Sequence, residues 1–154
     1  MRILQLFKTV YQLTGSFLGV NREQDIEVFH RLDAIVNASR LEKLLTYSFF
    51  TESLRREERD LLYTFVDALQ AVENQYQHPV VGLRARQFAS EMTGVLHIVT
   101  STFSSDDGEM FRFRLDPVDP TAQNREWDRL HDALETSWRA YKAYRQAVKD
   151  RFKV

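Results

Sequence analysis

Apolar residues recur at alternating steps of three and four through most of this chain, and this spacing limits the fold more than any other feature. Side chains three and four apart share one face of an α-helix, whereas a strand alternates at every second residue. The clearest run lies in residues 51–77, where the shared face holds Leu62, Phe65, Leu69, Val72 and Tyr76. Only five glycines and three prolines occur in 154 residues, so few helix breakers are present. The pattern predicts an all-α fold.

The same periodicity predicts five other helical segments along the chain. A break or kink is expected near Asn37, because Ser39 begins a capping-box pattern. Asp119 and Pro120 form a favourable start for the last helix, with Asp as the cap and Pro at the first helical position. We therefore expect a single helical domain over residues 1–154, a bundle of about five or six helices. These further segments cover residues 2–18, 23–36, 40–50, 80–103 and 120 to near the C-terminus.

One insertion near residues 104–119 departs from the helical pattern. A turn is predicted at Asp107–Gly108, and the letters MFRFRL that follow alternate apolar and charged residues, as a short strand does. A strand needs a partner for its backbone groups, and no second alternating run is obvious. The segment is therefore expected to be hairpin-like, to lie extended over the core, or to pair with another molecule. Its candidate partner-binding residues are Phe111, Arg112, Phe113 and Arg114.

Composition and missing motifs exclude several classes of chemistry. The chain has no cysteine, so disulfides, thiolate metal sites and Cys nucleophiles are excluded. It has no glycine-rich phosphate loop, no HExxH and no GxSxG. Its four histidines are far apart in sequence, and the net charge is −1. We expect no cofactor and no metal, and any contact with nucleic acid or a membrane must be local.

The N-terminal segment MRILQLFKTVYQLTGSFLGVN is apolar enough for a signal peptide to be considered. Gln5, Lys8 and Gln12 interrupt its apolar run, and no small-residue cleavage site follows. The segment is also too polar to span a bilayer. We therefore expect an amphipathic helix here, a cytoplasmic protein and no integral membrane insertion.

Arg125 and His131, with five residues between them, are the candidate catalytic pair in the last helix. This spacing resembles the Arg–x4–6–His motif of HEPN ribonucleases, a family of small all-helical domains. The resemblance implies a metal-independent ribonuclease in which these residues position an RNA phosphate and assist attack by the 2′-hydroxyl, usually across a dimer. Glu126 stands where the family commonly has a small polar residue. On a helix the two side chains would also point roughly 120° apart.

Charge is strongly segregated along the last helix. Residues 125–138 hold two Arg against four acids, and residues 139–154 hold six Lys or Arg against one acid. Acids near a helix N-terminus and bases near its C-terminus stabilise the helix dipole, which explains part of this pattern. Basic side chains on one face beside an aromatic ring can also bind an anion or a nucleic-acid backbone. The candidate residues for this surface, the basic stripe, are Arg139, Lys142, Arg145, Lys149 and Lys153, with Trp138 beside them.

These observations favour a small cytoplasmic helical protein that acts by binding, as an accessory or regulatory subunit rather than a catalyst. Its partner would be another protein, or RNA or DNA, and a homodimer is a further expectation. Two alternatives stay open. One is a HEPN-like ribonuclease that uses Arg125 and His131. The other is a toxin-neutralising partner, which would suit a compact helical bundle with segregated charge.

Overall fold

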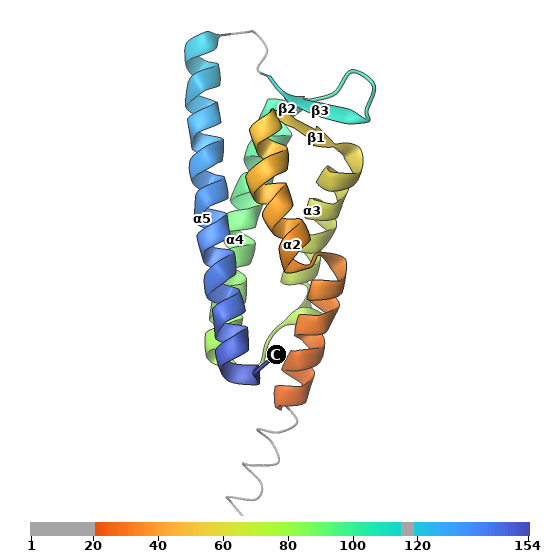
Figure 1. The fold of residues 1–154 in the computed structure, drawn as a ribbon, viewed down its shortest axis with the longest axis vertical. Coiled ribbons are helices and arrows are strands. Elements are labelled where there is room, and N and C mark those ends of the chain that lie inside the picture. The colour runs from red at the N-terminus through yellow and green to blue at the C-terminus, as the bar shows by residue number, and fades with distance from the viewer. Residues whose placement is uncertain (1–20, 115–118) are drawn as a thin grey trace, which may run out of the picture.

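The computed structural model describes residues 21–114 and 119–154, and within these ranges five α-helices dominate (Figure 1). The first described helix covers residues 21–35. The predicted all-α fold with one short hairpin insertion is confirmed, whereas the helix expected over residues 2–18 lies outside the described residues. No helix of the described part is long and apolar enough to cross a membrane. The other four α-helices are α2 (Ala38–Lys43), α3 (Arg56–Gln70), α4 (Pro79–Thr102) and α5 (Pro120–Phe152).

The two longest helices, α4 and α5, lie side by side along the length of the bundle (Figure 1). α5 has 33 residues, which makes it roughly 50 Å long. The face predicted for residues 80–103 is confirmed, since every member is buried in the core. These residues are Val81, Ala85, Phe88, Met92, Val95, Val99 and Phe103.

Helix starts follow the capping rules. The predicted break near Asn37 is present, but the cap is Asn37 rather than Ser39, which lies inside α2. The Asn37 side chain accepts a hydrogen bond from the Arg40 backbone N–H at 2.9 Å. Asp119 caps α5 by accepting from the Thr121 backbone N–H at 2.9 Å, and Pro120 follows at the first position. Each cap satisfies a backbone donor that has no partner inside its own helix.

Between α2 and α3 the backbone departs from regular helix. A π-helix, η1 (Leu44–Ser48), is followed by a 3-10 turn, η2 (Phe49–Thr51), and then by Glu52 with a φ of 54°. The sequence predicted an ordinary helix over residues 40–50, with its large apolar residues in the core. The burial is confirmed for Leu41, Leu44, Leu45 and Phe49, but the helix type is different.

A small antiparallel sheet closes one end of the bundle (Figure 1). Its strand order is β1-β3-β2, with β1 Ser53–Arg55, β2 Phe103–Ser104 and β3 Met110–Phe113. β3 is the predicted strand, and its partners lie in the same chain: Leu54 pairs with Phe111, and Phe103 pairs with Phe113. Residues 53–55 had been expected at the start of a helix. These residues form a strand because they pair with a segment more than 50 residues away in the sequence. Such long-range pairing produces no recognisable pattern in the local sequence.

The predicted turn at residues 107–108 is present between β2 and β3. Gly108 has a φ of 74°, a conformation that glycine adopts without steric cost. The Asp107 carboxylate accepts hydrogen bonds from the backbone N–H groups of Glu109 at 2.9 Å and Met110 at 3.2 Å. These donors favour the charged form and lower the pKa of Asp107 to about 2.

α3 ends at Gln70, earlier than its apolar pattern predicted. Val72 is 85% exposed, while Tyr76 is buried and its hydroxyl is hydrogen-bonded to that of Tyr144. Side chains replace the missing helical bonds, since the Asn74 amide donates to the Ala68 carbonyl at 2.9 Å. Residues 71–78 therefore form a connection between α3 and α4 that contains one short 3-10 helix, η3 (Val72–Asn74), rather than a continuation of α3.

Candidate functional site

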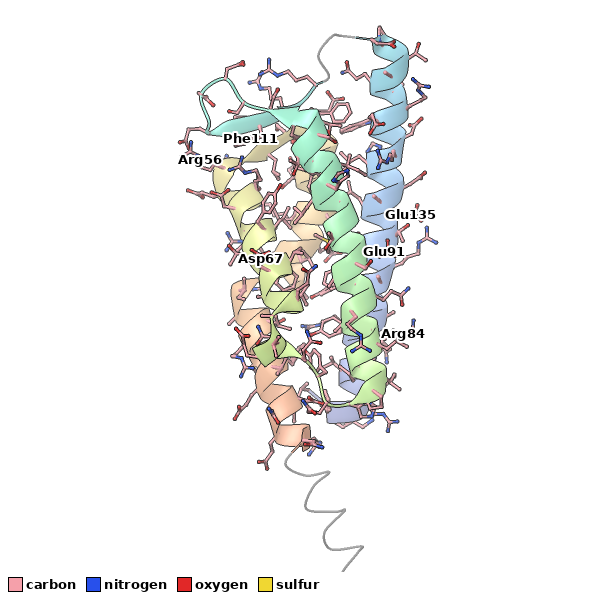
Figure 2. All side chains as sticks on the ribbon, turned by 180° about the vertical axis from the view of Figure 1, so that it is seen from behind. Arg56, Asp67, Arg84, Glu91, Phe111 and Glu135 are labelled. Atoms are coloured by element: carbon pink, nitrogen blue, oxygen red, sulfur yellow. The ribbon has the colours of Figure 1, made fainter. Side chains whose placement is uncertain are left out.

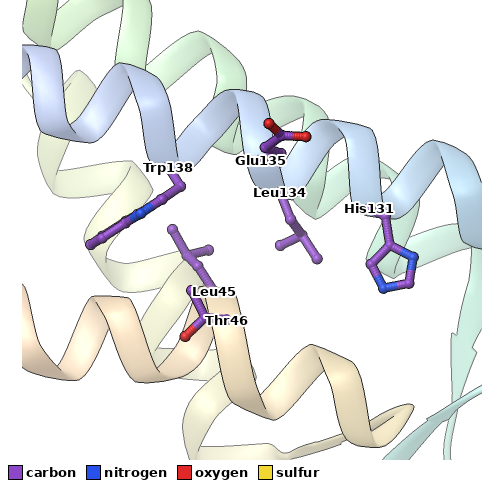
Figure 3. Close-up of a pocket in the computed structure, with 6 residues that line it drawn as sticks. All are labelled: Leu45, Thr46, His131, Leu134, Glu135 and Trp138. Carbon is purple, nitrogen blue, oxygen red and sulfur yellow. The ribbon is translucent and has the colours of Figure 1, made fainter.

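A pocket of 410 Å³ opens between α5 and η1 (Figure 3). Leu134 and Trp138 from α5 and Leu45 from η1 give it an apolar lining. In Figure 3 His131 and Trp138 lie at opposite ends of the pocket, and the Glu135 carboxylate is turned away from Leu45. The pocket therefore offers an apolar surface bordered by an imidazole and an indole.

A second pocket, of 390 Å³, continues along the same helix. It shares Trp138 with the first pocket and includes Phe29 from the helix over residues 21–35. We call the two together the α5 groove. The residues that define the groove in the argument below are Phe29, Leu45, Leu134, Trp138, Tyr141, Lys142, Lys149 and Val154.

The floor of the α5 groove is aromatic. The Tyr141 ring lies 5.5 Å from the Trp138 ring, centroid to centroid, in a stacked arrangement. Burial raises the pKa of the Tyr141 phenol to about 12, because the charged phenolate is poorly solvated there. Among the described residues its hydroxyl has no hydrogen-bond partner. Tyr141 therefore acts as an apolar packing group beneath Trp138.

Two members of the predicted basic stripe are already paired within the chain. The Arg145 guanidinium lies 2.5 Å from an Asp33 carboxylate oxygen, and its Cζ lies 4.6 Å from the centre of the Phe29 ring. Arg139 forms an ion pair with Glu135 at 3.1 Å, one helical turn away. Arg145 thus joins α5 to the helix over residues 21–35, and its role as an anion contact stays a prediction. Arg139 is exposed and partly neutralised.

The other three members of the basic stripe are exposed lysines. Lys142 and Lys149 border the α5 groove, and the Lys142 Nζ lies 5.8 Å from the centre of the Trp138 ring. Lys153 follows the last turn of α5 with a φ of 62°. In the described part of the chain none of the three makes an ion pair. Three of the five predicted cations are therefore without an ion pair in the described part of the chain, and of these Lys142 lies beside Trp138.

The structure places Arg125 and His131 in different surroundings. His131 lines the α5–η1 pocket, and its ring lies 4.5 Å from the Trp127 ring, centroid to centroid. Arg125 is exposed on α5 and lines neither pocket of the groove. Six residues along an α-helix separate two side chains by roughly 9 Å and 120°. Within one chain the two residues therefore do not form a common site.

The predicted partner-binding arm, residues 111–114, is largely occupied by contacts inside the protein. Phe113 is buried, and its ring packs edge-on against Phe103 and Trp127, so its contacts are made inside the protein. The Arg59 Cζ lies 3.9 Å above the centre of the Phe111 ring, and Arg114 pairs with Asp106 at 2.8 Å. Figure 2 shows Phe111 beside Arg56 at the sheet end of the bundle. Arg112 is the member of the arm that stays exposed without an ion pair among the described residues.

Sequence reasoning missed the wall of the groove that faces α5. Leu45 was expected in the core and is indeed almost fully buried, yet it also lines the pocket. Thr46 carries no sequence signal for a site, although it lines the same pocket. Both residues belong to η1. Because η1 and α5 are far apart in the sequence, the sequence does not show that they lie next to each other in the fold. The apolar spacing of residues 40–50 is the signal that the sequence offers for this wall of the pocket, and it predicts only that these side chains are buried.

Comparison with known proteins leaves the groove to be interpreted from its own geometry. No family model, curated protein or solved structure matches this chain significantly. Within residues 21–114 and 119–154 no group of three His, Asp or Glu side chains converges in a geometry suited to a metal ion. The described residues instead form an apolar groove, with aromatic side chains at its centre and lysines at its rim.

Proposed function

We propose that the protein is a binding subunit that holds an acidic amphipathic helix of a partner protein in the α5 groove. The observation that carries this proposal is the position of Trp138, which belongs to both pockets and lies between apolar side chains and lysines. An amphipathic helix binds such a groove by inserting apolar side chains spaced three, four and seven residues apart. By binding that helix, the protein would make it unavailable for the partner's other contacts and so regulate the partner. A toxin neutralised in this way would be one such partner.

The apolar part of the groove supports a protein ligand. Trp138 is half-buried, and Leu45 and Leu134 flank it in the first pocket. Full burial of one Leu-sized side chain contributes roughly 1.5–3 kcal/mol, and tryptophan is among the residues that most often dominate binding energy at interfaces. A nucleic-acid backbone would gain little from this lining. The groove therefore favours apolar side chains over phosphate groups.

The charge at the rim supports an acidic partner. Lys142 and Lys149 border the groove and make no ion pair within the described residues, while Arg139 is shared with Glu135. Rim charges of this kind steer association and set salt dependence more than they add affinity. Acidic residues that flank the apolar positions of a partner helix would complement these lysines. The ligand is accordingly expected to be amphipathic and negatively charged.

A displayed library of helical peptides with apolar residues at positions i, i+3, i+4 and i+7 and acids between them tests the proposal. We expect acidic members to be enriched on the wild-type protein. Trp138→Ala should weaken their binding about thirtyfold, equivalent to roughly 2 kcal/mol at an aromatic anchor. Replacing Lys142 and Lys149 together by Gln should weaken binding severalfold and flatten its dependence on salt, because two rim charges are lost. Fluorescence anisotropy of labelled peptides measures each effect.

Arg84→Gln is the matched control, since Arg84 is exposed on α4 and lines neither pocket of the groove (Figure 2). It should leave peptide binding unchanged. Enrichment of basic or uncharged peptides, or binding that survives Trp138→Ala, would contradict the proposal. A concentration-dependent doubling of the solution mass that Trp138→Ala abolishes would instead show that a second copy of this chain occupies the groove.

RNA cleavage by Arg125 and His131 is the second candidate, and the position of His131 in a pocket beside Trp127 is the observation that favours it. Under our proposal the protein leaves RNA intact in a chelator, and His131→Ala changes nothing in that assay. Gel electrophoresis of a labelled single-stranded RNA at micromolar protein measures this. Cleavage by the wild type that both His131→Ala and Arg125→Ala abolish, with unchanged helical circular dichroism, would establish a ribonuclease instead.

A further inference from the structure

A separate polar pocket of 370 Å³ lies where α2, η1, η2, β1 and α3 meet. Its lining differs from that of the α5 groove, because hydroxyl and charged side chains predominate. No residue lines both this pocket and the groove. The lining residues that matter for its chemistry are Lys43, Tyr47, Ser48, Ser53, Arg55 and Glu58.

The carboxylate of this pocket is engaged by neutral donors rather than by cations. Glu58 Oε1 accepts a hydrogen bond from the Ser48 hydroxyl at 3.0 Å, and its Oε2 accepts one from the Arg55 backbone N–H at 2.9 Å. Both oxygens of the group are thereby held in place. Glu58 closes the N-terminal turn of α3 and is not positioned as an ion-pair partner for the cations around it.

The two cations of the pocket have no acidic partner in the described part of the chain. Neither Lys43 nor the Arg55 guanidinium makes an ion pair there, whereas nearby arginines do: Arg56 pairs with Glu109 at 3.5 Å, and Arg59 pairs with Asp60 at 2.9 Å. Two cations and one carboxylate give the lining a net charge of +1. A pocket of this kind attracts an anion whose oxygens can bridge a lysine and an arginine.

One hydroxyl of the pocket can add a third donor. The Thr51 hydroxyl donates to the Ser48 carbonyl at 2.8 Å and is also 3.0 Å from the Ser53 hydroxyl. A hydroxyl has one proton, so Ser53 is the donor in the contact between them. That proton can turn to a ligand oxygen while Thr51 keeps its own bond. Ser53 therefore adds a neutral donor to the two cations.

The backbone around the pocket is irregular in a way that serves a binding site. Tyr47 and Ser48 belong to the π-helix η1, Thr51 ends the 3-10 turn η2, and Glu52 has a φ of 54°. π-helical turns occur frequently at functional sites, and a non-glycine residue with positive φ is an uncommon conformation. This departure from α-helix places the side chains of Tyr47, Ser48 and Thr51 along one side of the pocket.

We infer that this pocket binds a phosphate monoester. Arg55 presents the planar fork that matches phosphate oxygens, Lys43 adds a point charge, and Ser53 donates the third hydrogen bond. Tyr47, which is 64% exposed, and Met110 lie at the edge of the pocket and can contact the organic group. The phosphate belongs either to a small molecule or to a phosphorylated side chain of a protein. The inference is independent of the proposal for the α5 groove.

Titration of the ¹⁵N-labelled full chain, followed by amide NMR at constant ionic strength, tests this inference. The probes are inorganic phosphate, phenyl phosphate and a phosphoserine peptide. We expect saturable shifts in amides of residues 43–58, with both monoesters binding more tightly than inorganic phosphate. Lys43→Gln and Arg55→Gln should each raise the dissociation constant about tenfold, equivalent to about 1.4 kcal/mol, since each variant loses a charge-assisted hydrogen bond to the phosphate. Binding should weaken below about pH 6, where a phosphate monoester loses its second charge.

Lys149→Gln is the matched control, because it removes one positive charge from the α5 groove and leaves the polar pocket intact. It should not change the phosphate titration, and neither should Trp138→Ala, so failure of one site is distinguishable from failure of the other. The tighter of the two monoesters identifies the source of the ligand. Shifts that do not saturate, that sodium chloride reproduces, or that persist in both Lys43→Gln and Arg55→Gln would overturn the inference. The amide spectrum itself reports whether each variant is folded.

Discussion

Phe88→Ala is expected to lower the free energy of unfolding by about 3–5 kcal/mol, the range for removing a buried aromatic ring. Phe88 has no exposed surface and lies in the middle of α4, the helix that packs along α5. Its ring lies 5.2 Å from that of Tyr141 and 6.1 Å from that of Phe65, centroid to centroid. Alanine would leave a cavity between α3, α4 and α5 that these rigid rings cannot fill. Urea denaturation followed by circular dichroism measures the loss.

Leu83→Ala is the control for this prediction, because Leu83 lies on the same helix and is 57% exposed. Like Phe88→Ala, this variant replaces an apolar side chain by alanine, but it makes no cavity. We therefore expect it to lower the free energy of unfolding by at most about 1 kcal/mol, a typical value for a point mutation. Equal losses for the two variants would mean that the centre of the bundle is not packed as the structure describes. A loss below about 1 kcal/mol for Phe88→Ala would lead to the same conclusion.

Asp25→Ala is expected to lower the free energy of unfolding by about 3 kcal/mol, because two backbone donors lose a charged acceptor. The Asp25 side chain is 1% exposed, and its two oxygens accept hydrogen bonds from the backbone N–H groups of Gln77 at 2.7 Å and His78 at 2.8 Å. These bonds hold the connection between α3 and α4 against the helix over residues 21–35. Alanine cannot replace either bond. Guanidinium denaturation of the variant measures the effect.

Asp25→Asn separates the hydrogen bonds from simple loss of volume. Asparagine has nearly the same shape, keeps one acceptor oxygen and presents an NH2 group to the other backbone donor. We expect its loss of stability to be substantial, because one backbone N–H then faces another donor. Asp67→Ala on the exposed side of α3 is the control and should change stability by less than about 0.5 kcal/mol (Figure 2). If Asp25→Ala left the free energy of unfolding unchanged, water would have to replace the carboxylate as acceptor without loss of stability.

Most of the helical part of the fold could be predicted from local sequence. α4 and α5 follow from apolar residues at steps of three and four, and the start of α5 follows from Asp119 and Pro120. Such signals act within a few residues, because a helix satisfies its backbone hydrogen bonds locally. The end of α3 was missed for the opposite reason. Its last predicted turns are replaced by bonds to side chains such as Asp25, about 50 residues earlier in the chain.

The candidate sites could be predicted only in part. The sequence identified Trp138, Lys142 and Lys149 as surface residues of one helix face, and the structure places all three along the α5 groove. It could not reveal that Arg145 is bound to Asp33, 112 residues away, or that Leu45 forms the opposite wall. Helical periodicity says which face a side chain occupies. It does not say which other element covers that face.

The sequence by itself determined that this chain forms amphipathic helices, where α5 begins, and that the C-terminal half of α5 is basic. Tertiary structure decided that residues 53–55 become a strand beside β3, that Phe113 is buried against Trp127, and which cations stay unpaired. The physical reason is the range of the interactions. Helix caps and apolar spacing act within one or two turns, whereas sheet pairing, ion pairs between helices and the walls of a pocket join residues that meet only after the chain has packed.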